Sequence, residues 1–303
     1  MTLPIEAKVR EIIDAVKQNG DQALLTFTQK FDGLDVKDIK VGPETLKKAY
    51  ENAPRNLIDA LFHAKANIEA FHKLQLGQES LTWKTDEKTI RLETVPLDRV
   101  AIYAPGGRAA YPSSVLMNAI PAQIAGVKEI VLLTPPTQSP ETNPVYMAAW
   151  LLGITEVYSV GGAQAVAAAA YGTETIRPVD LISGPGNAYV TEAKRQVFGD
   201  VAIDMLAGPT ELTIIADDSA NPSFIAADLL AQAEHDPEAK LTLVDLGMDL
   251  DTLKDTLQLY LKENPTTPAN RSIQCLEIKN ARTVQDATEL VNKIAPEQNC
   301  NSS

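Results

Sequence analysis

Two residues with metal-binding side chains lie three positions apart in the second half of the chain. Gln232 and His235 end an Ala- and Leu-rich segment that is predicted to be a helix, so they would share one helix face, one turn apart. Imidazole nitrogen binds zinc, and a side-chain amide oxygen can serve as a weaker ligand. A zinc site normally needs at least three protein ligands, so this pair alone is incomplete. The spacing fits equally well a histidine that only stabilises the carboxyl end of a helix.

Further carboxylates that could do chemistry flank this helix in the sequence. Residues 203–212 are predicted to form a strand, a Gly-Pro turn at 208–209 and a second strand. Asp204 and Glu211 lie on either side of the turn and are either site carboxylates or solvated strand ends. Glu297 is a single carboxylate near the end of a predicted helix, and its position alone assigns it no catalytic role.

The other histidines and the cysteines favour structural roles. His63 and His72 lie in or beside a long amphipathic helix, where packing or a surface position explains them. Cys275 alternates with apolar neighbours on a strand predicted at 272–278, which favours a core position over a nucleophile. Together with Cys300 it makes only two cysteines, too few for a disulfide framework.

Three predicted strands end in glycine-containing turns that lead directly into helices. These turns lie at 105–107, 161–162 and 184–186. At the carboxyl ends of parallel strands, such turns let a phosphate or a dinucleotide approach the backbone N–H groups of helix N-termini. None has the G-x-G-x-x-G spacing, and any one of them is explained as an ordinary tight turn. Three turns at one sheet edge, however, favour a ligand cleft.

The elements that must position these residues follow from the hydrophobic pattern. Residues 5–75 are predicted to be helical with a break at Asn19-Gly20, and residues 81–95 a β-hairpin. From Val100 onwards, short β-branched segments alternate with Ala-rich helices, which predicts βαβ units, parallel sheets and the α/β class. Residues 298–303 show no pattern and are expected to fray.

Composition narrows the class of protein. The chain has 303 residues, enough for about two domains, and a formal net charge of −13. This charge repels phosphate backbones, so nucleic acid is not an expected partner. No segment has the ~18 consecutive apolar residues of a membrane span, and the first residues lack the apolar core of a signal peptide. The expected location is the cytoplasm, with no membrane partner.

Taken together, six motifs in order along the chain resemble the histidinol dehydrogenase family. They are Tyr103-Ala104-Pro105-Gly106-Gly107, Gly161-Gly162-Ala163-Gln164-Ala165, Gly184-Pro185-Gly186-Asn187, Glu192-Ala193-Lys194-Arg195, Ala207-Gly208-Pro209-Thr210-Glu211 and Gln232-Ala233-Glu234-His235. Each motif alone is weak, but the set is specific, and the resemblance extends from the N-terminal helices to about Glu297.

The resemblance implies a zinc-dependent, NAD-linked enzyme that oxidises L-histidinol to L-histidine through the aldehyde, in two hydride transfers. It implies two incomplete Rossmann-like domains with parallel-rich sheets flanked by helices. The expected division is a discontinuous α/β domain, residues 1–102 plus 216–303, and an NAD-binding domain, residues 103–215. The family is homodimeric, with one Zn²⁺ per subunit.

The resemblance also implies roles for individual residues. Tyr103, Gln164 and Asn187 match positions that contact NAD, and Thr210 matches a substrate-contacting position. Gln232 and His235 match two zinc ligands that also touch the substrate. Glu297 matches a general base that activates water in the second oxidation.

Two departures from the family pattern bear on activity. Glu297 is followed by Gln298 where the family has histidine, and glutamine cannot take up the alcohol proton. The two remaining zinc ligands and the C-terminal tail of the family have no counterpart here, and the N-terminus is shorter. The chain is therefore expected to be a truncated family member with little activity. The alternatives are a non-catalytic nucleotide-binding relative and a family dehydrogenase for another small polar alcohol.

Overall fold

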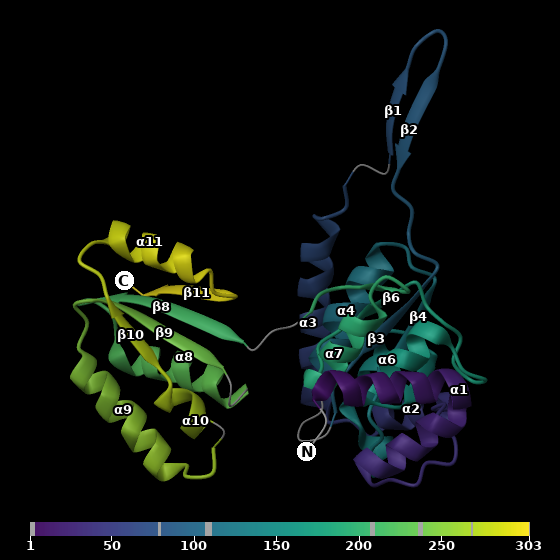
Figure 1. Ribbon diagram of the computed structural model, residues 1–303, viewed down its shortest axis with the longest axis horizontal. Coiled ribbons are helices and arrows are strands. Elements are labelled where there is room, and N and C mark those ends of the chain that lie inside the picture. The colour runs from purple at the N-terminus through teal and green to yellow at the C-terminus, as the bar shows by residue number, and fades with distance from the viewer. Residues whose placement is uncertain are drawn as a thin grey trace. The chain divides into compact units, whose positions relative to one another are not determined.

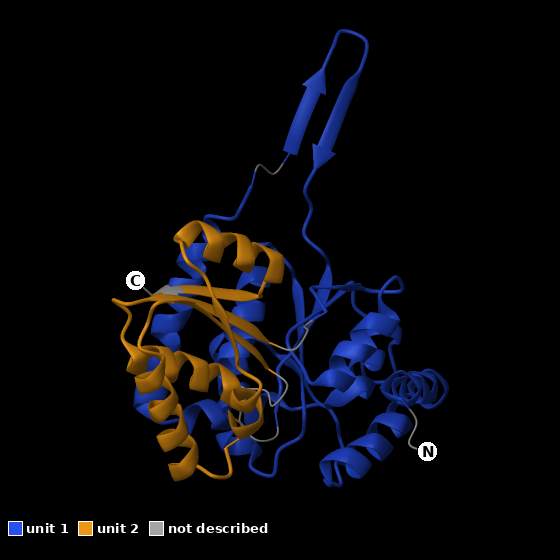
Figure 2. Ribbon diagram, turned by 60° about the vertical axis from the view of Figure 1, so that its left-hand side comes forward, with its two compact units in different colours: residues 1–206 blue, residues 207–303 orange. Residues whose placement is uncertain are grey.

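The computed structural model describes two compact units. It describes residues 4–77, 80–106, 111–206, 210–235, 239–267 and 269–302. The units comprise residues 1–206 and 207–303 (Figure 2). The expected division into residues 1–102 plus 216–303 and residues 103–215 stays a prediction.

Unit 1 begins with three helices. Helix α1 (Ile5–Asp32) has a kink at Gly20, whose φ of 49° lies in the left-handed region, close to the predicted break. Helices α2 (Pro43–Glu51) and α3 (Arg55–Lys73) follow, and each begins at a proline-containing turn. Their apolar stripes are buried, which is why these segments are helical in the folded chain.

A two-stranded antiparallel hairpin follows the helices, as predicted (Figure 1). Its strands are β1 (Ser80–Lys84) and β2 (Thr89–Glu93). The register places Leu81 opposite Leu92 and Trp83 opposite Ile90, so these four apolar side chains share one face. All four are more than half exposed, so the hairpin has an apolar face that no other described part of the chain covers.

The core of unit 1 is a five-stranded sheet in the order β5-β4-β3-β6-β7, and every pairing in it is parallel. The strands are β3 (Arg99–Tyr103), β4 (Glu129–Thr134), β5 (Glu156–Ser159), β6 (Leu181–Ser183) and β7 (Ala202–Ile203). The chain builds outward from β3 to β5, then returns to the other side of β3 with β6. The sheet therefore has a switch point between β3 and β6, where α/β proteins bind ligands at the carboxyl ends of the strands.

Helices cover both faces of this sheet. The additional elements are α4 (Pro112–Ile124), the 3₁₀ turn η1 (Pro140–Thr142), α5 (Pro144–Leu151), α6 (Gly162–Tyr171) and α7 (Ala188–Val197). One hydrophobic cluster joins α1, α6 and α7 to one face, and a second joins α2, α3, α4 and α5 to the other. All five residues of β3 are buried, as expected for a central parallel strand.

Unit 2 has a four-stranded parallel sheet in the order β10-β9-β8-β11. Its elements are β8 (Glu211–Asp217), α8 (Pro222–His235), β9 (Lys240–Leu246), α9 (Leu250–Glu263), α10 (Ala269–Gln274), β10 (Glu277–Asn280), α11 (Val284–Ile294) and β11 (Gln298–Ser302). Figure 1 shows α8 and α9 on one face of this sheet and α11 on the other. The predicted α/β class with parallel sheets flanked by helices is confirmed. In the described ranges, no helix is long and apolar enough to cross a membrane.

Two local predictions in unit 2 were wrong. Residues 269–274 form a helix, and Cys275 lies in the turn after it, exposed, instead of on a buried strand. Ala269, Ser272 and Ile273 have helical spacing and pack inward, a contact that a short alternating pattern does not reveal. Residues 298–302 pair with β8 instead of fraying, because backbone hydrogen bonds form a strand without apolar side chains.

Candidate functional site

A cavity of about 590 Å³ lies at the carboxyl ends of the strands in unit 1. It is lined by residues at the carboxyl ends of four neighbouring strands. Tyr103 is the last residue of β3, Pro135 follows β4, Gly162 comes after β5 and Asn187 comes after β6. The cavity thus includes the switch point, and its volume is within the range of ligand pockets. The three residues predicted to contact NAD, Tyr103, Gln164 and Asn187, all line it.

The Tyr103 side chain is fixed in the wall of the cavity. It is 3% exposed, and its hydroxyl accepts a hydrogen bond from the Gly162 backbone N–H at 3.0 Å. Burial raises the pKa of Tyr103 to about 12, and the nearby charge of Asp32 contributes in the same direction. The phenol is therefore neutral near pH 7, and it retains a proton that it can donate to a ligand.

Gln164 presents an unsatisfied acceptor beside this tyrosine. The residue is 1% exposed, and its Oε1 has no hydrogen-bond partner in the described part of the chain. Gln164 belongs to the first turn of α6, whose N-cap residue Gly161 supplies no side-chain cap. The Tyr103 hydroxyl accepts the first N–H of the helix, that of Gly162. A helix N-terminus attracts anions, and a buried carbonyl oxygen without a partner needs a donor. Both features fit a dinucleotide, whose pyrophosphate is anionic and whose remaining parts carry hydroxyl and amide donors.

Asn187 is the N-cap residue of α7, and its side chain can also contact a ligand. Its Oδ1 accepts hydrogen bonds from the backbone N–H groups of Tyr189 at 3.0 Å and Val190 at 3.2 Å, which caps the helix. The capping bonds use only the side-chain oxygen, so the amide NH₂ can donate to a ligand in the cavity. The cap and the ligand contact would therefore depend on one side chain.

An ion pair between a buried lysine and a partly exposed aspartate holds the loop that carries Asn187. The side chain of Lys194 is 4% exposed, and its Nζ donates to the Asp204 carboxylate and, at 3.1 Å, to the Gly184 carbonyl oxygen. Asp204 in turn accepts the N–H of Gly184 at 2.8 Å. Burial opposes ionisation of Asp204, but the hydrogen bonds from Lys194, Gly184 and Met205 lower its pKa below the ordinary value.

Gly184 must be glycine in this arrangement. Its φ is +114°, and a Cβ atom would lie 2.2 Å from the carbonyl oxygen of Tyr103. The ion pair thus binds both the N–H and the C=O of Gly184, whose backbone packs closely against Tyr103 at the end of β3. Sequence reasoning missed Lys194 as a positioning residue. The available signal was a lysine among the buried positions Val190, Ala193 and Val197 of α7.

The residues predicted to bind substrate and metal belong to unit 2. Thr210 precedes β8 and Glu297 precedes β11, and these strands are parallel neighbours, with Leu212 opposite Gln298. Helix α8 ends at His235, before β9, so Gln232 also lies toward the amino-terminal edge of this sheet. Glu297 is exposed and Gln232 is partly buried.

The described residues give no complete metal site. The predicted turn at 208–209 and the side chain of His235 lie outside the described residues. Among the residues that are described, no group of three or more His, Cys, Asp or Glu side chains could hold a metal ion. The chemistry of the Gln232 and His235 donors nevertheless fits zinc.

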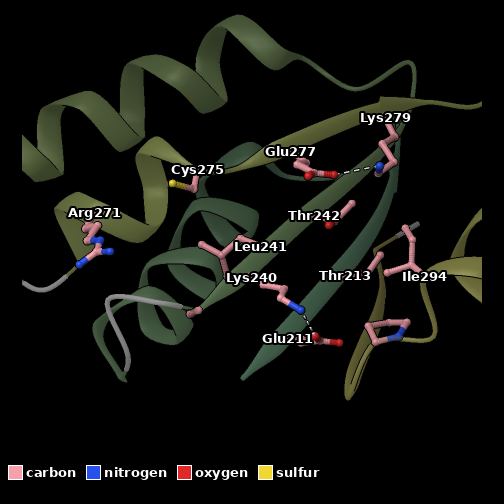
Figure 3. A pocket seen from close by; sticks show the side chains of 12 residues that line it. Glu211, Thr213, Lys240, Leu241, Thr242, Arg271, Cys275, Glu277, Lys279 and Ile294 are labelled. Carbon is pink, nitrogen blue, oxygen red and sulfur yellow. Dashed lines mark hydrogen bonds and ion pairs between the residues drawn. The ribbon is translucent and has the colours of Figure 1, made fainter. Parts of the chain in front are cut away.

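A second cavity, of about 380 Å³, lies on the sheet of unit 2 (Figure 3). Two ion pairs lie along its wall, Lys240 with Glu211 at 2.7 Å and Lys279 with Glu277 at 2.8 Å, and Figure 3 marks both. Glu211 is therefore paired with a lysine and differs from Glu297, which has no such partner among the described residues.

Comparison with known proteins shows which family shares this architecture. Residues 2–299 match the family described as histidinol dehydrogenase. A relative named histidinol dehydrogenase from Synechococcus sp. is 52% identical over 250 residues, which is 82% of this chain and 58% of the relative. Another of that name, from Streptococcus mutans, is 45% identical over 304 residues, covering 97% of this chain and 70% of the relative.

A solved structure agrees with the sequence comparison. The crystal structure of histidinol dehydrogenase from Elizabethkingia anophelis superposes with a TM-score of 0.88 at 37% identity, covering 99% of this chain and 70% of that one. The chain thus spans between about 58% and 70% of the length of these relatives. The match over nearly all of its residues establishes that the chain belongs to the histidinol dehydrogenase family.

Proposed function

We propose that the protein is a zinc-dependent, NAD-linked oxidoreductase that converts L-histidinol to L-histidine through the aldehyde, in histidine biosynthesis. Family membership supports the reaction class. The observation that carries the proposal is the cavity at the switch point of unit 1, which combines the N-terminus of α6 with the unsatisfied Oε1 of Gln164. A non-catalytic relative or a dehydrogenase for another alcohol is not favoured, because the similar relatives carry the name of this enzyme.

NAD, when bound in this cavity, supplies the hydride acceptor for both oxidation steps. The N-terminus of α6 would hold the pyrophosphate. The Tyr103 hydroxyl and the Asn187 amide, which line the cavity, would donate hydrogen bonds to the dinucleotide, and Gln164 would accept one. These contacts orient the dinucleotide, and the apolar wall formed by Pro135 excludes water from one side.

The substrate residues would act from unit 2. Zinc, when bound, orients the amino alcohol and polarises its oxygen. Gln232 and His235, one turn apart on α8, would hold the metal together with ligands from elsewhere, and Thr210 would contact the substrate. Glu297, a carboxylate that can act as a general base, would remove a proton from water in the second oxidation.

The direct experiment combines a binding and a turnover measurement on the 303-residue chain. Calorimetric titration with NAD should give saturable binding, and NADH absorbance should increase only slowly when L-histidinol and zinc are added, because Gln298 cannot take up the alcohol proton. Substitution of Gln232 by alanine should reduce turnover, because Gln232 would hold the metal and contact the substrate. It should leave NAD affinity unchanged, because Gln232 does not line the cavity of unit 1. A chain that does not bind NAD would refute the assignment of the cavity.

A homodimer is part of the same proposal. The apolar face of the β1–β2 hairpin, formed by Leu81, Trp83, Ile90 and Leu92, supports it. A two-stranded hairpin is marginally stable alone, so a partner surface that covers these side chains would stabilise it. The expected cytoplasmic location also belongs to the proposal, and fractionation of cells that express the protein tests it.

A further inference from the structure

One charged residue stands out in the cavity of unit 1. Among the described residues that line it, Asp32 is the only charged one, and none is lysine or arginine. Partial burial raises the pKa of Asp32, and the residue itself is exposed to solvent at the rim of the cavity. Asp32 and Tyr103 both line the cavity, and the carboxylate charge adds to the raised pKa of Tyr103.

Asp32 occupies a position that helix stability does not favour. It is the last residue of α1, where the carbonyl end of the helix repels a carboxylate. It has no hydrogen bond or ion pair with any other residue that the structure describes. A charged residue that destabilises its helix and has no ion-pair partner is expected at a functional site.

The kink in α1 is what brings Asp32 to the cavity. Ile12 and Asp32 both line it, yet in a straight helix their separation along the sequence would place them about 30 Å apart. The helix bends at Gly20, where a Cβ would lie 2.1 Å from Glu174 Oε2, and Glu174 accepts the N–H of Asp21 at 2.8 Å. The kink needs both a residue that tolerates the left-handed region and a carboxylate aligned with the N–H that follows it.

We propose that Asp32 binds the two hydroxyls of the adenosine ribose and makes this site selective for NAD over NADP. A carboxylate accepts hydrogen bonds from a vicinal diol, and it repels the phosphate that NADP carries on the 2′-oxygen. The position at the solvent-facing rim suits the adenosine half, because the nicotinamide must lie where hydride transfer is shielded from water. This inference rests on the proposed assignment of the cavity to NAD.

The test measures the dissociation constants of NAD and NADP by calorimetry on the whole chain and on three variants. The wild-type chain should bind NAD at least about tenfold more tightly than NADP. Asp32→Asn should weaken NAD binding by about tenfold and leave NADP binding unchanged or improved. Asp32→Arg should reverse the preference. Asp35→Asn is the matched control, because it removes the same charge from an exposed residue that does not line the cavity.

Each outcome has a separate meaning. If the wild-type chain binds neither nucleotide, the assignment of the cavity to NAD fails. If NAD binds but Asp32→Asn keeps the wild-type ratio of NAD to NADP affinity, the role of Asp32 is wrong while the cavity assignment survives. An equal loss of both affinities would place Asp32 at the nicotinamide half and would also overturn the proposal. Circular dichroism spectra of the variants identify any that do not fold.

Discussion

At the scale of single residues, the candidate site is defined by polar atoms that the folded chain leaves without partners. Gln164 Oε1 is the clearest case, because it is buried and unsatisfied beside the neutral hydroxyl of Tyr103. A buried acceptor without a donor destabilises the protein, and a ligand that supplies the donor removes that cost. This atom therefore lowers the stability of the free protein and raises its affinity for the nucleotide.

Substitution of Gln164 by leucine separates the two effects. The free energy of unfolding should stay the same or increase by up to about 1 kcal/mol, because an unsatisfied acceptor is removed. NAD affinity should fall by about tenfold. Urea denaturation and calorimetry measure the two quantities. The control is Gln18→Leu, at an exposed position of α1, which should change neither. A variant that loses stability and keeps its NAD affinity would contradict this account.

At the scale of elements, two ion-pair systems hold the strands and the loop that form the cavity. Lys194 and Asp204 hold the loop after β6, and Arg99 connects the amino ends of three strands. The Arg99 guanidinium bonds Glu129 at 2.8 Å and Glu156 at 2.8 Å, so β3 is tied to β4 and β5. These contacts join residues far apart in sequence.

Breaking the first pair should affect both stability and binding. Lys194→Met leaves the Asp204 carboxylate without its cation, so the free energy of unfolding should fall by about 2–3 kcal/mol. NAD affinity should fall as well, because the loop that carries Asn187 loses an anchor. The double variant with Asp204→Asn should lose less stability than the sum of the single variants. Urea denaturation tests this. Lys48→Met, which breaks an exposed ion pair, is the control and should change the free energy of unfolding little. Additive losses would refute coupling.

The Arg99 system predicts a pH dependence. The hydrogen bond from Arg99 lowers the pKa of Glu156 in the folded chain. A lowered pKa contributes stability above the unfolded-state value of 4.5, and this contribution is lost as the pH falls below it. Glu156→Gln should therefore be less stable than wild type at pH 7, and the difference should shrink toward pH 3. Urea midpoints at both pH values test this. Glu51→Gln, in an exposed pair, should show little difference at either pH. A constant difference would contradict the prediction.

At the scale of the whole molecule, the β1–β2 hairpin is the feature that supports association of two chains. Substitution of Trp83 and Ile90 by serine together should reduce the dimer fraction, because it removes one apolar cross-strand pair from the exposed face. Light scattering over a range of concentrations measures the dimer fraction. Arg91→Ser changes the opposite, polar face and should leave it unchanged. A wild-type chain that is monomeric at all concentrations would refute the role of the hairpin.

The sequence by itself determined the α/β class, the parallel strands from Val100 onwards, the break near Gly20 and the placing of three glycine-containing turns at one sheet edge. These follow from periodicity, turn chemistry and motif order, which are local properties of the chain. The family resemblance added roles that spacing alone left open, such as that of Gln232.

Only the tertiary structure decided the remaining features. It revealed that Asp32 lines the cavity, that Lys194 and Asp204 hold Gly184, and that Cys275 is exposed. The last strand likewise depends on backbone pairing with β8, which no side-chain pattern records. Each of these features rests on contact between segments distant in sequence, or on the direction in which a bent helix continues, and local patterns carry no information about either.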